Sequence, residues 1–226
     1  SPEDDQIHNL TPLTTITTVN FFMIIRVPFV ASLPDMQLRD AGIGIYETQL
    51  ESLDGLEALR SLGNRDVFIM YNERLEDLTA LSAVEQTGET SLLIRSNSML
   101  TNLDGMEFAS GTARTIDIQE NPALVDLSAL SNLTSARYVF KIRGNNALES
   151  LSGLDQIGSF KNPLGYTDMG ISNNAQLRDC SALAIALGYP TRPWNPDSDN
   201  LTGSFFIGEN ALGANSPDQC LDSYAQ

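Results

Sequence analysis

Residues 117–130 read DIQENPALVDLSAL, and the spacing of their apolar residues decides the fold that we predict. Ile118 is followed by Leu124, and two more leucines come after it at intervals of three residues. A single Asn121 precedes Leu124 by three residues. This spacing matches neither the 3.6-residue period of an amphipathic helix nor the alternation of a strand. The stretch therefore belongs to a longer repeat.

The pattern I-x-I-x-x-N-x-x-L-x-x-L-x-x-L recurs along the chain. Its five best copies begin at Val67, Leu92, Ile116, Phe140 and Met169. The first leucine after the asparagine stands at positions 75, 100, 124, 148 and 177, so the steps are 25, 24, 24 and 29 residues. Weaker copies occupy 22–36 and 43–56, and a last fragment occupies 205–212. The sequence thus predicts about eight coils of 24–25 residues, with atypical coils at the ends, where caps belong.

Each part of the repeat has a physical reason. The I-x-I segment alternates, so it predicts a short strand with its isoleucines inward. The leucines at every third residue close the coil, and stacked coils share one apolar core. A buried asparagine at the turn satisfies backbone groups and stacks on its counterparts in neighbouring coils. We expect this asparagine ladder to contain Asn72, Asn97, Asn121, Asn145, Asn174 and Asn210.

The predicted fold is mainly β, a right-handed β-helix or leucine-rich solenoid that forms one domain. The chain has 226 residues, of which 42% are hydrophobic, so it is long and apolar enough to bury such a core. Residues 1–21 are expected to form an N-terminal cap, 22–187 the coils and 188–226 a C-terminal cap. An ordinary leucine-rich-repeat horseshoe is the alternative, but its strand motif L-x-x-L-x-L fits this sequence less well.

The N-x-x-L-x-x-L-x-G/A-L pattern over residues 43–185 resembles the receptor L domain, a leucine-rich β-helical module of receptor ectodomains and of fungal and bacterial surface proteins. The segments RDCSALAIALGYP and SPDQCLDSY resemble the C-terminal cap of bacterial members. The resemblance implies a Cys180–Cys220 disulfide and an extracellular or cell-surface address. The first coil lacks its asparagine, and no cysteine-rich module follows, so a role like that of animal hormone receptors is not implied.

The charge balance narrows the possible partners. The chain carries 29 acidic and 13 basic residues, a net charge of −16, which argues against nucleic acids and anionic membranes. No run of 18 apolar residues is present, so no membrane span is expected. The N-terminal SPEDD is interpreted as a trimmed end, from which a lipid or surface anchor has been lost.

The sequence offers little for catalysis. It has one histidine, His8, and it has no phosphate-binding glycine motif, so we expect no enzyme activity, no cofactor and no metal. The GIG at 42–44 is interpreted as turn and close-packing glycines, and the acidic residues of the turns as a solvated face. Asp197 and Asp199 in NPDSDN (195–200) are spaced as in calcium loops, but the remaining ligands are missing, so calcium binding there is left open.

The outward positions of the strands are the better candidates for function. With the isoleucines inward, the residues beside them face outward across one sheet: Met23, Ile25 and Gly44 in the first coils, apolar and aromatic residues next, and basic residues after them. Aromatic residues, Met and Arg are enriched at protein interfaces. We predict a partner-binding surface that comprises Tyr46, Phe68, Met70, Leu93, Arg95, Gln119, Lys141 and Arg143. The alternative is that residues 1–20 or 158–168 fold over this patch.

These observations favour a non-catalytic recognition or adhesion module that binds a protein or peptide. Two other functions stay open. A structural cell-envelope protein would self-associate through the sheet face. A carbohydrate-binding module would use the loop 188–203, where Tyr189 and Trp194 could stack on a sugar, although Trp194 is better explained as a plug of the core. The N-L-T sequons at Asn9, Asn132 and Asn200 are interpreted as unglycosylated.

Overall fold

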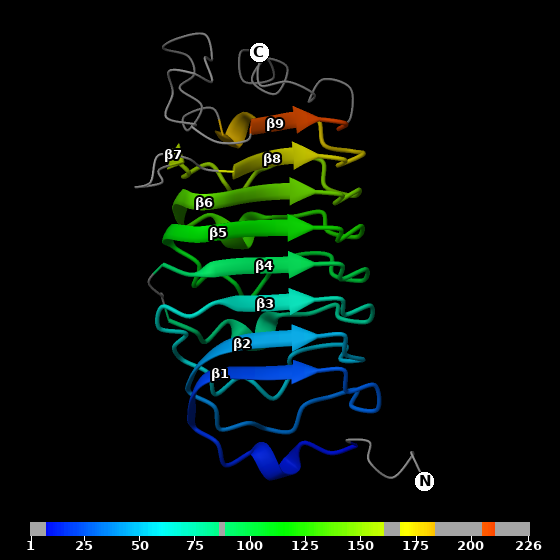
Figure 1. The fold of residues 1–226 in the computed structure, drawn as a ribbon, viewed down its shortest axis with the longest axis vertical. Coiled ribbons are helices and arrows are strands. Elements are labelled where there is room, and N and C mark those ends of the chain that lie inside the picture. The colour runs from blue at the N-terminus through cyan, green and yellow to red at the C-terminus, as the bar shows by residue number, and fades with distance from the viewer. Residues whose placement is uncertain (1–7, 86–88, 161–167, 184–204, 211–226) are drawn as a thin grey trace.

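The computed structural model describes residues 8–85, 89–160, 168–183 and 205–210. They form a parallel β-solenoid of about six turns with a repeat of about 24 residues (Figure 1). The sheet order β1-β2-β3-β4-β5-β6-β8-β9 follows the chain, and every pairing is parallel. The mainly β solenoid and its repeat length are therefore confirmed.

The strands are short and regularly spaced. They are β1 (Thr18–Ile25), β2 (Asp40–Tyr46), β3 (Val67–Met70), β4 (Ser91–Arg95), β5 (Gly111–Gln119), β6 (Leu133–Arg143), β8 (Asp168–Ser172) and β9 (Phe205–Gly208), with β7 (Ser159–Phe160) beside β6. Four 3-10 turns complete the described elements: η1 (Thr11–Leu13), η2 (Thr79–Leu81), η3 (Ser128–Leu130) and η4 (Ser181–Leu183). The structure has about six turns, fewer than the eight coils expected from the sequence.

The register places one isoleucine of each strand at the same depth. Ile45 pairs with Ile69, Ile69 with Ile94, and the column continues through Ile118, Ile142, Ile171 and Ile207. All of them are buried, as are the leucines of the L-x-x-L-x-x-L runs. A one-residue slip would turn each isoleucine to the opposite face, so the shared core fixes the register.

The coils alternate between two types on the side opposite the sheet. One type contains a 3-10 turn, η2, η3 or η4, whose first backbone N–H is accepted by Asp77, Asp126 or Asp179. The other type has a glycine with φ near +100° instead, at positions 55, 105 and 153. A Cβ atom on Gly105 or Gly153 would collide with the carbonyl oxygen of Leu78 or Leu127 in the preceding coil. The repeat is therefore a pair of coils.

A second backbone feature recurs at the end of each strand. The residue that follows the strand has a positive φ in Arg26, Glu47, Tyr71, Ser96, Glu120, Gly144, Asn173 and Glu209. This left-handed residue reverses the chain immediately before the ladder position. Seven of these eight residues carry a side chain, at a steric cost of about 1 kcal/mol each. The fold accepts that cost because every coil must turn at the same place.

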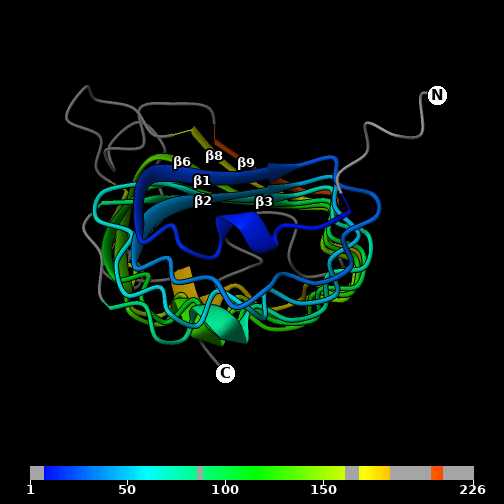
Figure 2. The same cartoon turned by 90° about the horizontal axis from the view of Figure 1, so that it is seen from below.

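The N-terminal segment caps one end of the solenoid. Figure 2 looks onto this end and shows η1 lying across the middle of the coil cross-section. Leu10 is buried in the core, and Leu13 packs against it. The backbone N–H groups of Gln37 and Arg39 donate to the carbonyl oxygens of Thr14 and Thr17. In its described part, 8–20, this segment therefore does not cover the sheet face, and that alternative is wrong for these residues.

Candidate binding face

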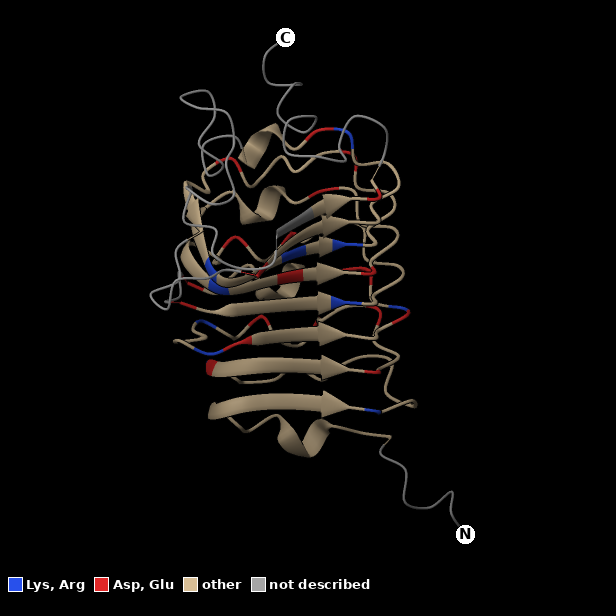
Figure 3. Cartoon of the chain, turned by 45° about the horizontal axis from the view of Figure 1, so that its top comes forward, with Lys and Arg blue, Asp and Glu red and all other residues tan. Residues whose placement is uncertain are grey.

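The eight residues predicted to bind a partner lie together on the outer face of the sheet. One column runs through Phe68, Leu93, Asp117, Lys141 and Gly170, and its neighbour through Tyr46, Met70, Arg95, Gln119, Arg143 and Ser172. We call these two columns, with Phe21, Met23 and Ile25 of β1, the outer face. Figure 3 shows its division: the first strands are largely uncharged, whereas basic and acidic residues occupy the later ones.

Phe21 rests on two glycines at the N-terminal end of the outer face. Its ring fills the space where Gly42 and Gly44 lack side chains, since a Cβ on either glycine would lie within 2.9 Å of it. The same ring contacts that of Phe68, with the centroids 5.5 Å apart. The close-packing interpretation of the GIG motif is confirmed, and the turn interpretation is wrong, because both glycines lie inside β2.

The apolar half of the outer face is partly open to solvent. Met23 and Ile25 are 46% and 49% exposed. Tyr71, the left-handed residue after β3, is 47% exposed, and its ring lies 6.3 Å from that of Tyr46. Met70, in contrast, is only 6% exposed, so it offers little accessible surface to a partner. Sequence reasoning missed Phe21 and Tyr71, which lie outside the two positions flanking the inward isoleucine.

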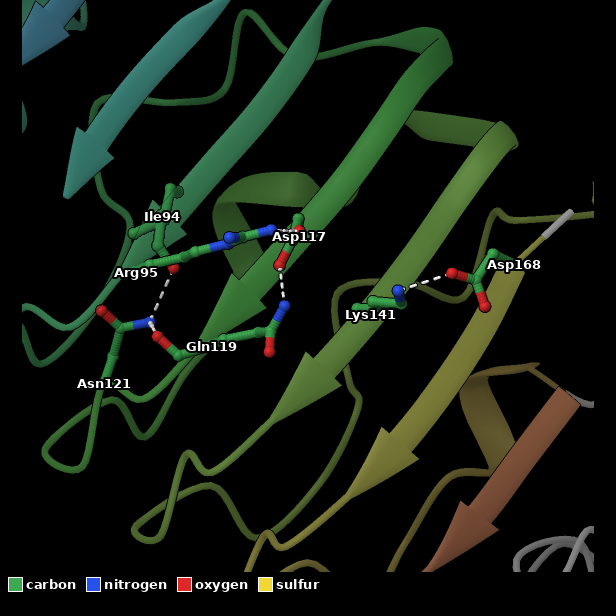
Figure 4. A network of polar contacts seen from close by, with 7 residues as sticks. All are labelled: Ile94, Arg95, Asp117, Gln119, Asn121, Lys141 and Asp168. Atoms are coloured by element: carbon green, nitrogen blue, oxygen red, sulfur yellow. Dashed lines mark hydrogen bonds and ion pairs between the residues drawn. The ribbon is translucent and has the colours of Figure 1, made fainter. Parts of the chain in front are cut away.

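The basic residues of the outer face are mostly paired. Arg95 forms an ion pair with Asp117, whose side chain is 3% exposed and also accepts a hydrogen bond from Gln119 Nε2 (Figure 4). Lys141 Nζ lies 2.5 Å from a carboxylate oxygen of Asp168. Arg143 is exposed and forms no ion pair within the described part of the chain. The three basic residues predicted for this face are therefore not equally available to a partner.

Arg95 is held in place by its acidic neighbour. The hydrogen bond to Asp117 raises the pKa of the Arg95 guanidinium above its ordinary value, although burial opposes the shift. The Nε atom of Arg95 is buried and has no hydrogen-bond partner. Arg95 is therefore charged and fixed, with its strongest contact inside the protein. It shapes the face, whereas Arg143 presents its charge to solvent.

The six predicted asparagines lie in one column at the turn. In each case the Oδ1 atom accepts a hydrogen bond from the backbone N–H of the residue at the ladder position of the preceding coil. Asn121 accepts it from Asn97 at 3.0 Å. The Nδ2 atom donates to an isoleucine carbonyl of the preceding coil, Ile94 for Asn121, at 2.9 Å (Figure 4). Thr48 occupies the ladder position of the coil without an asparagine and donates to Asn72. The first five asparagines are fully buried.

Some predicted features fall outside the described residues. They include Cys220, Tyr189, Trp194 and the loop 195–200, so the cap disulfide, the sugar platform and the calcium loop stay predictions. Residues 161–167 also lie outside the described residues, so the covering of the patch by 158–168 stays a prediction too. Cys180 is buried, at 1% exposure. In the described part of the chain, no three histidine, cysteine or acidic side chains gather as a metal site would need. Nor does the same part of the chain contain a helix of the length and hydrophobicity that a membrane span requires.

Comparison with known proteins identifies no relative. No protein-family model matches the chain, and neither the curated proteins nor the solved structures contain a significant match.

Proposed function

We propose that this chain is a non-catalytic recognition or adhesion module that binds a protein or peptide through its outer face. The observation that carries the proposal is the pair of half-exposed residues Met23 and Ile25, which continue into Tyr46, Phe68 and Leu93 on adjacent strands. Contiguous apolar patches of this kind mark interaction sites in proteins that are otherwise polar. The described part of the N-terminal cap lies across the end of the solenoid and not on the sheet (Figure 2).

We further propose that the chain is an exported protein of the receptor L-domain type. The asparagine ladder and the leucine spacing support this relationship, and the exported address rests on the Cys180–Cys220 disulfide. Disulfides persist in oxidising compartments. A thiol count on the denatured, non-reduced protein should find no free cysteine. Two free thiols would contradict both the cap disulfide and the extracellular address.

The proposed face is tested with two matched double variants. Met23→Asp with Ile25→Asp places charges on the outer face, whereas Met99→Asp with Val125→Asp places them at residues 48% and 56% exposed beyond the ladder. Wild-type protein and both variants are used to capture extracellular proteins, and the affinity of each captured protein is then measured directly. We expect only the outer-face variant to lose affinity, by about tenfold or more.

Equal affinity of the wild type and both variants would overturn the proposed binding face. Sedimentation velocity on the same three proteins distinguishes a structural role. A wild-type dimer that only the outer-face variant dissociates would make this face a self-assembly surface instead. Circular dichroism confirms that each variant is folded.

A further inference from the structure

A hollow of about 230 Å³ interrupts the outer face at its C-terminal half. It lies over Gly170 of β8, whose register partners are Lys141 on β6 and Phe206 on β9. Among the side chains that the structure describes, a Cβ on Gly170 would have only the Lys141 Cγ within contact distance, at 3.9 Å. Arg143, Gln119 and Ser172 complete the wall from the adjacent column. The missing side chain at Gly170 therefore leaves a hollow whose wall contains the basic Lys141 and Arg143 of β6 and the acidic Asp168 of β8.

The charges around the hollow do not cancel. Lys141 is balanced by Asp168, and Arg95 nearby is balanced by Asp117. Arg143 has no such acidic neighbour among the described residues and is exposed. The chain has a net charge of −16, and most of the basic side chains that the structure describes form ion pairs with acidic ones. The hollow is thus a local excess of positive charge on an acidic protein.

We propose that this hollow binds a carboxylate, the side chain of an acidic residue on the protein partner. The proposal rests on the function proposed above and adds the chemistry of the partner. The Arg143 guanidinium offers two parallel N–H donors that match a carboxylate. Lys141 has three N–H donors, so it keeps others after bonding Asp168. A neutral or basic group would leave the charge of Arg143 unmatched.

The position of the hollow also constrains the partner segment. Three strand steps separate Leu93 on β4 from Gly170 on β8. At about 4.8 Å a step, the apolar half and the hollow lie about 14 Å apart. An extended chain covers that distance in about four residues. The partner segment would therefore cross the strands with an apolar residue about four positions from an acidic one.

The test is an NMR titration of the full chain with two probes of equal size. N-acetylglutamate N-methylamide carries the carboxylate, and the corresponding glutamine derivative replaces it with an amide. We expect saturable shifts of the Gly170 and Ser172 amides with the acidic probe only. Arg143→Gln should weaken that binding about tenfold or more, because hydrogen bonds to charged groups are the strong ones. Arg178→Gln, which changes an exposed arginine between the ladder residue Asn174 and η4, should leave that binding unchanged.

Equal shifts with both probes, or undiminished binding in Arg143→Gln, would overturn the carboxylate site. Gly170→Leu, which fills the hollow and keeps its charges, should abolish binding, and retained binding there would also overturn it. N-acetylphenylalanine amide, titrated separately, reports on Phe68 and Leu93. If this probe shifts the signals of Phe68 and Leu93 while the acidic probe leaves the Gly170 and Ser172 amides unchanged, only the carboxylate site is refuted. If the acidic probe shifts the Gly170 and Ser172 amides while the phenylalanine probe leaves Phe68 and Leu93 unchanged, the apolar half of the proposed face is refuted instead.

Discussion

One asparagine in each of the six coils from Asn72 to Asn210 satisfies backbone groups that the turn would otherwise leave without hydrogen-bond partners. Asn145 accepts the backbone N–H of Asn121 and donates to the Ile118 carbonyl oxygen. Both of those groups are buried, and a buried polar group without a partner costs about 1–3 kcal/mol. A shorter or unbranched side chain cannot reach both coils. The recurrence of asparagine is therefore structural in origin.

Adjacent asparagines allow a matched test. Asn145→Ala should lower the free energy of unfolding by about 3 kcal/mol, since it orphans at least two buried backbone groups. Asn146 is exposed, and its side chain accepts one long hydrogen bond of 3.4 Å from the Ala175 backbone. Asn146→Ala should cost at most about 0.5 kcal/mol. Urea unfolding of both variants measures the difference, and similar losses would show that the ladder does not stabilise the fold.

The left-handed residues also align side chains between coils. Arg26 and Glu47 follow β1 and β2, and their side chains form a two-point ion pair with N···O distances of 2.5 and 3.0 Å. The hydrogen bond from Arg26 lowers the pKa of Glu47 below its ordinary value of 4.5, although desolvation opposes the shift. The contribution of this pair to stability is therefore present above about pH 4.5 and is lost as the pH falls through the folded-state pKa of Glu47.

The titration of Glu47 provides a second test. In Arg26→Gln, the pKa of Glu47 should rise toward its ordinary value, because the charged donor is gone. In Arg39→Gln, which changes an exposed arginine that forms no ion pair in the described chain, it should stay low. Side-chain carboxyl NMR against pH follows both variants. An unchanged pKa in Arg26→Gln would mean that the ion pair does not persist in solution.

At the scale of the elements, the alternation of two coil types determines how neighbouring coils approach. In a coil that has the positive-φ glycine, this glycine lies against a carbonyl oxygen of the preceding coil that has the 3-10 turn. Each pair of coils therefore needs one residue without a Cβ. Acidic residues accept the N–H groups of these turns, as Asp155 does from Gly153 at 2.9 Å. Many of the acidic residues of the turns are therefore more than a solvated face. They complete the backbone hydrogen bonding.

Two glycines of one coil test the alternation. Gly153→Ala should cost about 3 kcal/mol, because its φ is +98° and the added methyl group would meet the Leu127 carbonyl. Gly158→Ala should cost no more than about 0.5 kcal/mol, because no atom of the described residues lies within 4 Å of that methyl group. Equal unfolding midpoints in urea for the two variants would contradict the close contact between coils.

The sequence predicted the elements better than it predicted the contacts between them. The isoleucine and leucine spacing revealed the strands and their inward side, because stacking allows only one register. The glycine or alanine before the third leucine was visible in the repeat, yet its strict alternation was not recognised. Pairs such as Arg95 with Asp117 join neighbouring coils, 22 residues apart. They could be found only by aligning the outward columns and asking which charges would meet.

At the scale of the whole molecule, the solenoid offers one broad surface that its own described chain does not fill. The core is shared by all coils and is filled by their inward residues. The apolar half, the paired charges and the hollow at Gly170 then divide that surface along the stack. A binding role requires that the first of these regions be open to solvent in the complete chain.

Side-chain footprinting of the 226-residue chain tests that requirement most directly. A carbene reagent labels exposed side chains. Mass spectrometry then compares the extent of labelling at Met23 and Ile25 with that at Met99 and Val125, which follow the ladder residues Asn97 and Asn121. Their exposed fractions are similar, so we expect comparable labelling at both places. Strong protection of Met23 and Ile25 alone would mean that another part of the chain covers the outer face, and the proposed binding surface would then be part of the interior.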